Sequence, residues 1–211
     1  MANGSDFTKA LEIGRPPNVA KLFPNSKALL VSGKVIDRAM GAKGNAIALA
    51  ANGRNHFVIR GVLQAAQRAN AAVIIEIAKS EGGRSAYCPV NYWNMARQVD
   101  AVCNELGITV PVAIHADHYG IKSDKDLAEA KVEVPTMFEA GITSIAIDAS
   151  HLPDDKNLLA NIAINRRFLP GQAWRPRSVR SRGVRAFPRC PKRFSLSRGS
   201  MPMIFSPTGS P

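Results

Sequence analysis

The chain has 211 residues, of which 45% are hydrophobic, and it carries a formal net charge of +12. This length allows one ordinary domain with a sizeable core, or one domain with an appendage, and no apolar run approaches the roughly 18 residues of a membrane-spanning helix. The start of the chain lacks the apolar stretch of a secretory signal, and three widely spaced cysteines without a CxxC pair indicate neither a disulfide framework nor a cysteine zinc site, so we expect a cytoplasmic protein.

Residues 1–45 form a predicted N-terminal extension that precedes the first regular pattern. A helix is predicted somewhere between Leu30 and Met40, although Gly33 weakens the helical pattern. The sequence gives this extension no functional interpretation.

Four short apolar segments follow and are predicted to be strands: 46–51, 72–78, 110–114 and 143–147. Each is rich in branched or small apolar residues and ends at a polar residue. Such runs are typical of strands that are buried on both faces, as in parallel sheets. A buried helical turn is the alternative for any one of them, but their regular alternation with helical patterns argues against it.

Amphipathic helical patterns lie between these strands. An early one places four apolar residues on one face: Val58, Val62, Leu63 and Ala66. The clearest one has apolar residues spaced by 3, 4, 3 and 4 positions, namely Tyr92, Met95, Val99, Val102 and Leu106. Gly107 follows at the position where glycine commonly ends a helix.

Three later helices are predicted from residues that are typical of helix starts. The third begins at Ser123, with Asp126 three residues later in a pattern close to a capping box. Pro135 is predicted to end this helix and to begin a second short one, because proline lacks the backbone donor and favours a first helical position. A fourth helix is predicted to begin after Pro153.

Together these elements predict an α/β protein with about four consecutive βα units in residues 46–165. Two topologies remain open at this point: a doubly wound open sheet, or half of an eight-stranded βα barrel. No GxGxxG follows the first strand, so the sequence gives a dinucleotide site no support.

The last 46 residues, 166–211, differ from the rest in composition. They hold ten Arg, one Lys, seven Pro and seven Ser, with no Asp or Glu. Since 11 of the 28 basic side chains lie here, the other 165 residues carry 17 basic and 16 acidic side chains and are nearly neutral. We expect a disordered basic tail.

Three origins of this tail are open. It could be an arm that binds nucleic acid, since arginine clusters neutralise phosphates, or an inert solvated tail. The interpretation favoured by the complete absence of acids is an out-of-frame translation, because shifted frames of GC-rich DNA read mostly as Arg, Pro, Ser, Ala and Gly. Nucleic acid is therefore not the expected partner.

Polar side chains that could bind a ligand or transfer a proton follow each predicted strand. They are Asn52 after the first, Lys79 and Ser80 after the second, His115, Asp117 and His118 after the third, and Asp148, Ser150 and His151 after the fourth. In βα barrels this edge is the active-site face. For Asn52 and Ser150 alone, an ordinary role as loop residues is the better interpretation.

The third strand has the densest group, His115-Ala116-Asp117-His118. Strand periodicity places His115 and Asp117 on one side, and His118 on the other unless the strand has already turned. The group offers an imidazole for a metal and a carboxylate for proton transfer. As a bare pattern it is more often structural than metal-binding, because a catalytic zinc needs about three protein ligands.

Three stretches resemble class II aldolases of the fructose-bisphosphate type. VPVAIHADHYG resembles a signature of that family, an apolar strand that ends in His-x-Asp-His, and FEAGITSIAIDASHLPDDKNL resembles its next strand and loop. ALAANGRNHFVIRGVLQAAQRANAAVIIEIAKSEG is similar to the family's opening strand, helix and strand. The resemblance covers residues 46–165.

This resemblance implies a (βα)8 barrel of which residues 46–165 are the first half. It implies reversible cleavage of fructose 1,6-bisphosphate into dihydroxyacetone phosphate and glyceraldehyde 3-phosphate, with zinc as cofactor and a phosphorylated ketose as substrate. A half-barrel that pairs with itself would bury its open sheet edges, so a homo-oligomer is expected if the chain folds. Asp117 would be the proton-shuttling acid and His118 a zinc ligand. Ser80 would lie near a substrate phosphate, although Ala78 aligns about as well. Tyr119 departs from the family pattern and is expected to crowd the metal loop.

The family's later machinery has no counterpart in this sequence. The resemblance implies two further zinc histidines and a catalytic glutamate, yet no histidine follows His151 and no acid follows Asp155. We therefore expect a truncated or frameshifted chain that is poorly folded or dependent on a partner, and inactive as an aldolase.

Overall fold

The computed structural model describes residues 4–168, which lie in one of the two compact units of the chain. Its centre is a four-stranded parallel sheet in the order β1-β2-β3-β4, formed by β1 (Leu49–Asn52), β2 (Val73–Ala78), β3 (Val112–Gly120) and β4 (Ser144–Asp148). Consecutive strands are neighbours throughout. A doubly wound sheet reverses its strand order at a switch point, so this order is that of the predicted partial (βα)8 barrel, with about four βα units.

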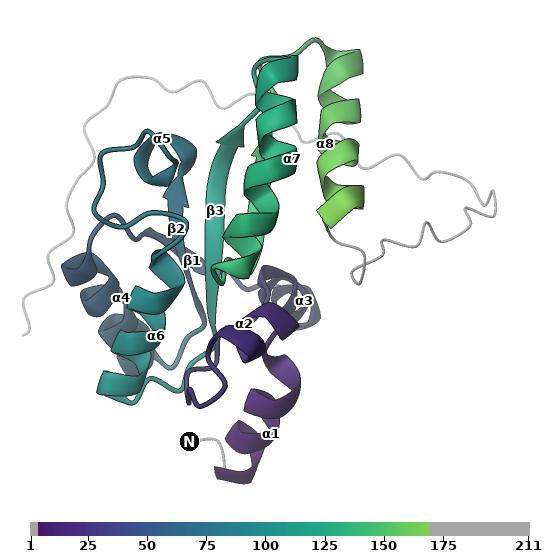
Figure 1. Cartoon of the computed structure of the whole chain (residues 1–211). Helices are drawn as coiled ribbons and strands as arrows, with labels where there is room; N and C mark the ends of the chain where they lie inside the picture. Colours follow the sequence, from purple (N-terminus) through teal and green to yellow (C-terminus); the bar gives the residue numbers. More distant parts are fainter. Residues whose placement is uncertain (1–3, 169–211) are drawn as a thin grey trace, which may run out of the picture. The chain divides into compact units, whose positions relative to one another are not determined.

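Helices cover the outer face of the sheet (Figure 1). They are α4 (His56–Ala69), the short α5 (Lys79–Gly82), α6 (Met95–Leu106), α7 (Asp124–Glu139) and α8 (Asp154–Phe168). Apolar side chains of α4 and α6, such as Ile59, Leu63 and Val99, are buried in one cluster with the outward-facing Ile75 and Ile114 of the strands. This cluster is the main core.

The N-terminal helices cover the sheet near the amino ends of its strands. These helices are α1 (Gly4–Gly14), α2 (Pro17–Leu22) and α3 (Gly33–Lys43). A second apolar cluster joins Leu11 and Ile36 of these helices to Ile74 and Ala113, which belong to the inner face of β2 and β3. The N-terminal segment therefore covers the inner face near the amino ends of the strands, which the sequence did not predict beyond one helix.

Several boundary predictions are confirmed. Helix α6 ends at Gly107, which has a left-handed conformation (φ 62°), and α7 begins with Ser123, whose side chain accepts a hydrogen bond from the backbone N–H of Asp126 at 3.2 Å. Helix α8 begins at Asp154, directly after Pro153. Local capping chemistry thus determines these ends.

Other predictions are corrected by the structure. Pro135 lies inside one continuous helix α7 and does not divide it. The first strand was predicted to be buried on both faces. In the structure β1 lies at the edge of the sheet, and its Leu49 is 66% exposed. In α4 the buried face contains Ile59, whereas Val58 is exposed. The exposure of β1 follows from its place at the edge of the sheet, which the local pattern does not specify.

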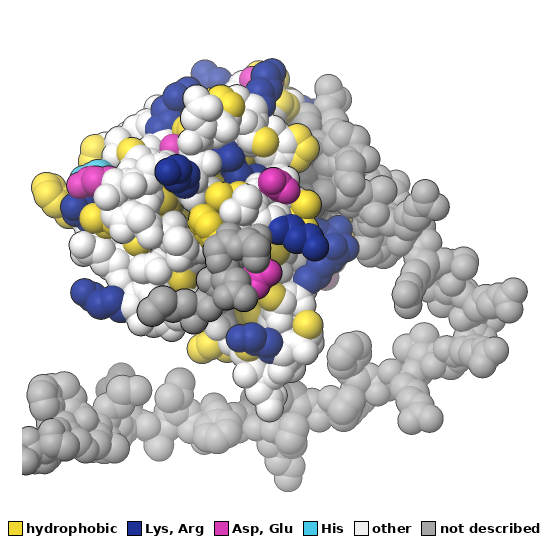
Figure 2. All heavy atoms as spheres, turned by 90° about the horizontal axis from the view of Figure 1, so that it is seen from below, with side chains coloured by type: hydrophobic (Ala, Val, Ile, Leu, Met, Phe, Trp, Pro, Cys, Tyr) yellow, Lys and Arg dark blue, Asp and Glu magenta, His cyan; other side chains and the backbone are white. Residues whose placement is uncertain are grey.

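Charged groups are dispersed over the surface seen in Figure 2, where Lys and Arg side chains are scattered among apolar and uncharged groups. The predicted basic tail, 166–211, lies outside the described residues from residue 169 onward, and so does the proposed nucleic-acid arm. No helix among residues 4–168 is long and apolar enough to span a bilayer. Cys88 and Cys103 are free thiols, and burial raises the pKa of Cys103 to about 12.

Candidate active site

The carboxyl end of β3 contains an irregularity that brings Asp117 and His118 together. The pairing of β3 with β4 shifts register between Ala116 and Tyr119, and His118 has a positive φ of 43°. Regular alternation would send His118 to the opposite side of the sheet from Asp117, but a bulge adds a residue and turns the strand. As a result, His118 Nε2 lies 3.6 Å from Asp117 Oδ2.

Tyr119 occupies the opposite side of this bulge. Its side chain is fully buried in the main core, and its hydroxyl donates a 2.6 Å hydrogen bond to Glu133 of α7. The Lys79 ammonium lies 4.4 Å from the centre of its ring. The prediction that Tyr119 crowds the metal loop is therefore wrong, since the residue anchors the strand to the core.

Asp148, at the end of β4, orients the His118 ring from its other side. His118 Nδ1 lies 3.4 Å from Asp148 Oδ2. Hydrogen bonds from Ser150, together with the contact to His118, lower the pKa of Asp148 to about 2. An ionised carboxylate therefore faces Nδ1, while Nε2 faces Asp117. The ring itself is 71% exposed and accessible to a ligand.

A pocket of about 420 Å³ opens at this edge of the sheet. Its lining combines the ends of three strands: Ala78, Lys79, Ser80, His118, Gly120, Lys122, Asp126, Asp148 and His151. Two lysines, a serine, two imidazoles and the carboxylates of Asp126 and Asp148 thus share this lining. Ser80 and Ala78, the two residues between which the sequence could not choose, both line it.

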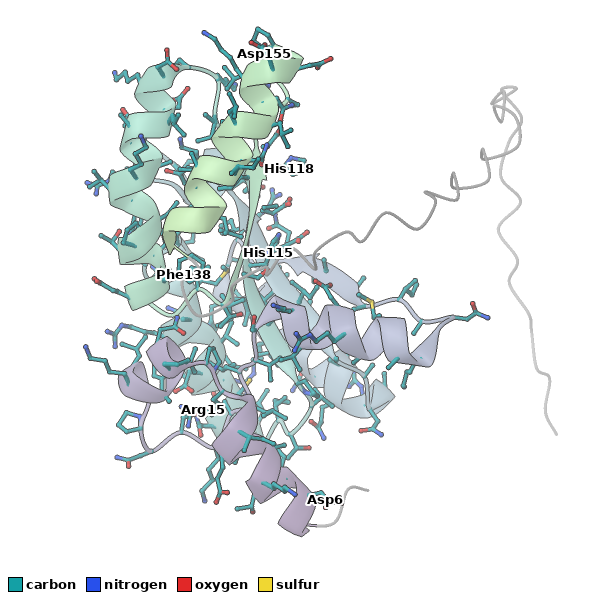
Figure 3. All side chains as sticks on the ribbon, turned by 90° about the vertical axis from the view of Figure 1, so that its right-hand side faces the viewer. Asp6, Arg15, His115, His118, Phe138 and Asp155 are labelled. Atoms are coloured by element: carbon teal, nitrogen blue, oxygen red, sulfur yellow. The ribbon has the colours of Figure 1, made fainter. Side chains whose placement is uncertain are left out.

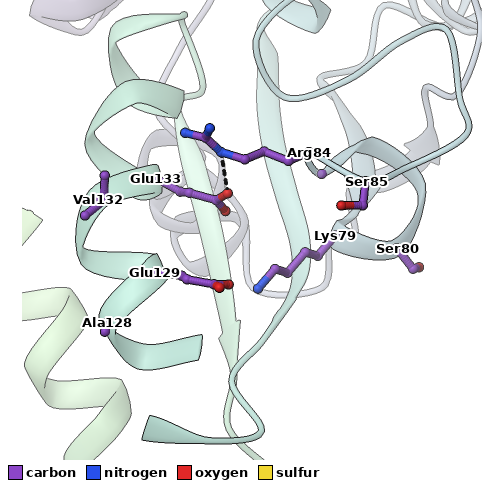
Figure 4. A pocket seen from close by; sticks show the side chains of 9 residues that line it. Lys79, Ser80, Arg84, Ser85, Ala128, Glu129, Val132 and Glu133 are labelled. Atoms are coloured by element: carbon purple, nitrogen blue, oxygen red, sulfur yellow. Dashed lines mark ion pairs between the residues drawn. The ribbon is translucent and has the colours of Figure 1, made fainter. Parts of the chain in front are cut away.

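An adjoining pocket of about 700 Å³ shares Lys79 and Ser80 and lies between α5 and α7 (Figure 4). In this view the Lys79 ammonium points toward Glu129, and Arg84 forms an ion pair with Glu133 across the pocket at 2.7 Å. The same Glu133 accepts the hydrogen bond from the Tyr119 hydroxyl. This pocket thus lies against the groups that support the bulge.

A polar row crosses the inner face of the sheet below this edge. The strand register aligns Asn52, Glu76, His115 and Ser144 on four neighbouring strands. Asn52 donates to Glu81 at 2.6 Å and accepts from Arg54, so its amide is engaged in local structure.

Asp117 lies two residues beyond this row on β3, and single ligand atoms of Glu76, His115 and Asp117 lie within 4.8 Å of one another. Burial, followed by the nearby Asp117, raises the pKa of Glu76. Burial also lowers the pKa of His115, which favours its neutral form. The sequence analysis missed Glu76, although a single acid inside the otherwise apolar β2 was the available signal.

Figure 3 shows His115 and His118 along the same strand, with His118 nearer to the end of the sheet where α8 begins and Asp155 is labelled. Asp6 and Arg15 lie at the opposite end. The structure thus brings Asp117, His118 and Asp148 together at one edge, with His115 deeper on the inner face. His151, which the sequence grouped with them, lines the same pocket from an exposed position.

The imidazole of His118 thus lies between two carboxylates at the carboxyl edge of a parallel βα sheet, which is the edge where enzymes of the βα-barrel class have their active sites. The family model of class II fructose-bisphosphate aldolases matches residues 34–167. The chain belongs to this family of aldolases.

Individual relatives also match only part of the chain. The chain is 35% identical to a fructose-bisphosphate aldolase of Staphylococcus aureus over 99 residues, which are 47% of this chain and 30% of the relative. It is 30% identical to that of Treponema pallidum over 120 residues, 57% of this chain and 33% of the relative. The chain thus spans about a third of the length of these relatives.

A solved structure has the same fold. The YdjI aldolase of Escherichia coli K12 superposes with a TM-score of 0.52 at 22% identity, over 68% of this chain and 49% of that one. This similarity supports the partial barrel that the strand order indicates.

Proposed function

We propose that the described residues carry the first half of the active site of a fructose-bisphosphate aldolase, which cleaves fructose 1,6-bisphosphate reversibly into dihydroxyacetone phosphate and glyceraldehyde 3-phosphate. The observation that carries this proposal is the bulge in β3, which sets His118 Nε2 3.6 Å from Asp117 Oδ2 at the open edge of the sheet. Membership of the family supplies the reaction class.

In this proposal Asp117 moves the proton. Its carboxylate accepts the proton of the hydroxyl beside the breaking carbon–carbon bond, that hydroxyl carbon becomes the aldehyde, and the electron pair of the bond passes to the ketone fragment. The same carboxyl returns the proton in the condensation direction. By the family resemblance, the proton that the ketone fragment takes up comes from a glutamate in a later part of the barrel.

His118 would hold the metal, for which we propose zinc. When bound, the metal polarises the ketone oxygen as a Lewis acid. The residues present fit this role: Asp148 faces Nδ1 and leaves Nε2 for a metal, and a metal-ligating histidine commonly donates its other ring N–H to such a carboxylate. Asp148 would therefore act by fixing the ring.

The substrate would enter the 420 Å³ pocket. Lys79, Lys122 and Ser80 lie on its lining together with His118. Ammonium and hydroxyl groups bind phosphate oxygens by charge-assisted hydrogen bonds, so this wall suits one phosphate of a ketose bisphosphate. We assign the serine role to Ser80 as a proposal, because Ala78 has no hydroxyl.

We further propose that the 211 residues by themselves do not cleave the substrate. A catalytic zinc needs about three protein ligands and one open position, and the four histidines of the chain are His56, His115, His118 and His151. Of these, only His118 lies between carboxylates at the edge of the sheet. The proposed domain organisation is an extension, 1–45, a half-barrel, 46–165, and a tail, 166–211.

A chimera tests the catalytic assignment. Residues 34–167 would replace the matching segment of the S. aureus fructose-bisphosphate aldolase, and cleavage of fructose 1,6-bisphosphate would be measured. We expect Asp117→Asn to lower kcat by roughly 10²–10⁴-fold, the usual contribution of a positioned acid–base group, and His118→Ala to abolish zinc retention and activity together.

Asp155→Asn is the matched control, because Asp155 is an exposed acid on the surface of α8. It should leave kcat unchanged. An active chimera in which Asp117→Asn and Asp155→Asn behaved alike would remove Asp117 from the mechanism, and full zinc content in His118→Ala would remove His118.

A further inference from the structure

The first and last strands of the sheet each have one open side. Strand β1 has four residues and pairs only with β2, and β4 has five residues and pairs only with β3. Within residues 4–168, no other strand pairs with the outer side of either. Open strand edges present unpaired backbone groups to another chain, and these two edges are parallel to each other and of similar length.

Helix α4, which follows β1, has polar contacts on the side that faces α6. His56 Nδ1 lies 2.9 Å from the side-chain oxygen of Gln98. Arg60 forms an ion pair at 2.8 Å with Glu105. Val58 is two positions from both His56 and Arg60, and two residues of a helix turn by about 200°. Val58 therefore faces away from α6.

The side of α4 that faces away from α6 is an apolar stripe. Its residues follow one another at spacings of 4, 3 and 4, namely Val58, Val62, Ala65 and Ala69. Val62 is half-buried and the other three are exposed. Figure 1 shows α4 and α8 on opposite flanks of the sheet, so this stripe borders the flank that is open beside β1.

The two flanking units carry opposite charges. The β1–α4 unit, residues 49–69, has three arginines and no acid, a net charge of +3. The β4–α8 unit up to residue 164 has three aspartates and one lysine, a net charge of −2. Arg54 lies just before α4, and Asp154 and Asp155 begin α8 at the same carboxyl edge of the sheet. Complementary charges of this kind favour contact between the two flanks of different copies.

We propose that two copies of this chain close one eight-stranded barrel, in which β4 and α8 of each copy lie beside β1 and α4 of the other. Eight parallel strands form a barrel whose interior side chains can fill, and each copy supplies four of them in consecutive order. A half-turn about the barrel axis relates the copies and keeps all strands parallel.

Closure by this half-turn makes the same contact twice and leaves no edge open. A contact between two different surfaces forms a closed ring when its rotation closes, and an open filament otherwise. The pairing buries the stripe of α4 and Leu49, which is 66% exposed in the single copy. A second copy thus satisfies both open flanks at once. This assembly does not depend on aldol cleavage.

The first measurement is sedimentation equilibrium of the full 211-residue chain over a range of concentrations. We expect a reversible dimer and no larger species, because closure uses both flanks. The dimer should weaken when salt rises from about 0.1 M to about 1 M, since salt screens the charges that the flanks bring together.

A pair of adjacent substitutions on α4 tests the stripe. Val58→Lys should raise the dissociation constant of the dimer by more than about tenfold, because it places a charge in both apolar contacts. Phe57→Lys is the matched control: it introduces the same side chain one position away, on a different side of the helix, where Phe57 is 83% exposed. Both positions are exposed, so both variants should fold, which circular dichroism checks.

Mixing two variants tests which flanks meet. Leu158→Glu changes a side chain of α8 that is 64% exposed, and it should also weaken the dimer when present alone. An equimolar mixture of Val58→Lys and Leu158→Glu should dimerise more tightly than either variant. In the mixed dimer one contact is unchanged, and the other pairs lysine with glutamate.

Three results would overturn the proposal. The first is an unchanged chain that stays monomeric, which would leave its flanks to a different polypeptide, or that grows beyond a dimer. The second is equal dimerisation of Val58→Lys and Phe57→Lys. The third is a Leu158→Glu variant that dimerises as the unchanged chain does, since α4 would then meet a surface other than α8. None of these results decides whether the chimera is active, so the two proposals can fail separately.

Discussion

Two neighbouring tyrosines show how single residues determine the geometry of the site. Tyr92 donates a hydrogen bond to the backbone carbonyl of Asp117 at 3.3 Å, and Tyr119 donates to Glu133 at 2.6 Å. Both side chains are fully buried. They hold the backbone on either side of His118, whose positive φ is uncommon for a residue with a side chain.

Removal of one hydroxyl tests this anchor. Tyr119→Phe should lower the free energy of unfolding by about 1.5–3 kcal/mol, the range for a hydrogen bond to a charged group, because Glu133 would keep only its pair with Arg84. The measurement is urea denaturation followed by circular dichroism. Tyr87→Phe, at a side chain that is 75% exposed, should change stability by less than about 0.5 kcal/mol; equal effects would contradict the anchor.

At the scale of elements, α7 connects the site to the N-terminal helices. Asn18 of α2 donates one hydrogen bond to Phe138 O in the last turn of α7 and a second to Ile142 O, just beyond the end of the helix. Gly141 follows, with a φ of 101°, and a Cβ built on it would lie 2.5 Å from that of Ala96 in α6. Helices α2, α6 and α7 therefore meet at a point that only glycine fits.

Two glycine substitutions should have opposite effects. Gly141→Ala should destabilise the chain by roughly 1–3 kcal/mol, as overpacked core positions do, with backbone strain in addition. Gly61→Ala, in the exposed interior of α4 with no atom within 4 Å of the new methyl group, should stabilise it by about 0.5–1 kcal/mol. Urea midpoints measured in parallel check both, and a stabilising Gly141→Ala would refute the described packing.

At the scale of the whole molecule, the described sheet has two edge strands, β1 and β4. Leu49 of β1 is 66% exposed, and Ile47, two residues before the strand, is 98% exposed. Exposed apolar edge strands pair readily with other chains. The structure thus offers a physical route to self-association of the kind that the sequence analysis expected for a half-barrel.

Charges on this edge should suppress that association. The double variant Ile47→Lys and Leu49→Lys should reduce the concentration dependence of the sedimentation coefficient, because lysine on an edge strand disfavours pairing. Ile13→Lys, which places the same charge on α1 at a side chain that is 76% exposed, is the control. Equal behaviour of the two variants would show that the β1 edge is not the contact.

Local sequence alone determined the parallel βα pattern, the helix ends at Ser123 and Gly107, and the family, since periodicity, capping residues and motifs are short-range features. Tertiary structure decided the rest. Only the pairing of β3 with β4 creates the bulge that joins Asp117 to His118, and only the register of β2 with β3 places Glu76 beside His115. These contacts depend on residues distant in the chain, and a strand pattern records which side a residue faces but not which strand lies next to it.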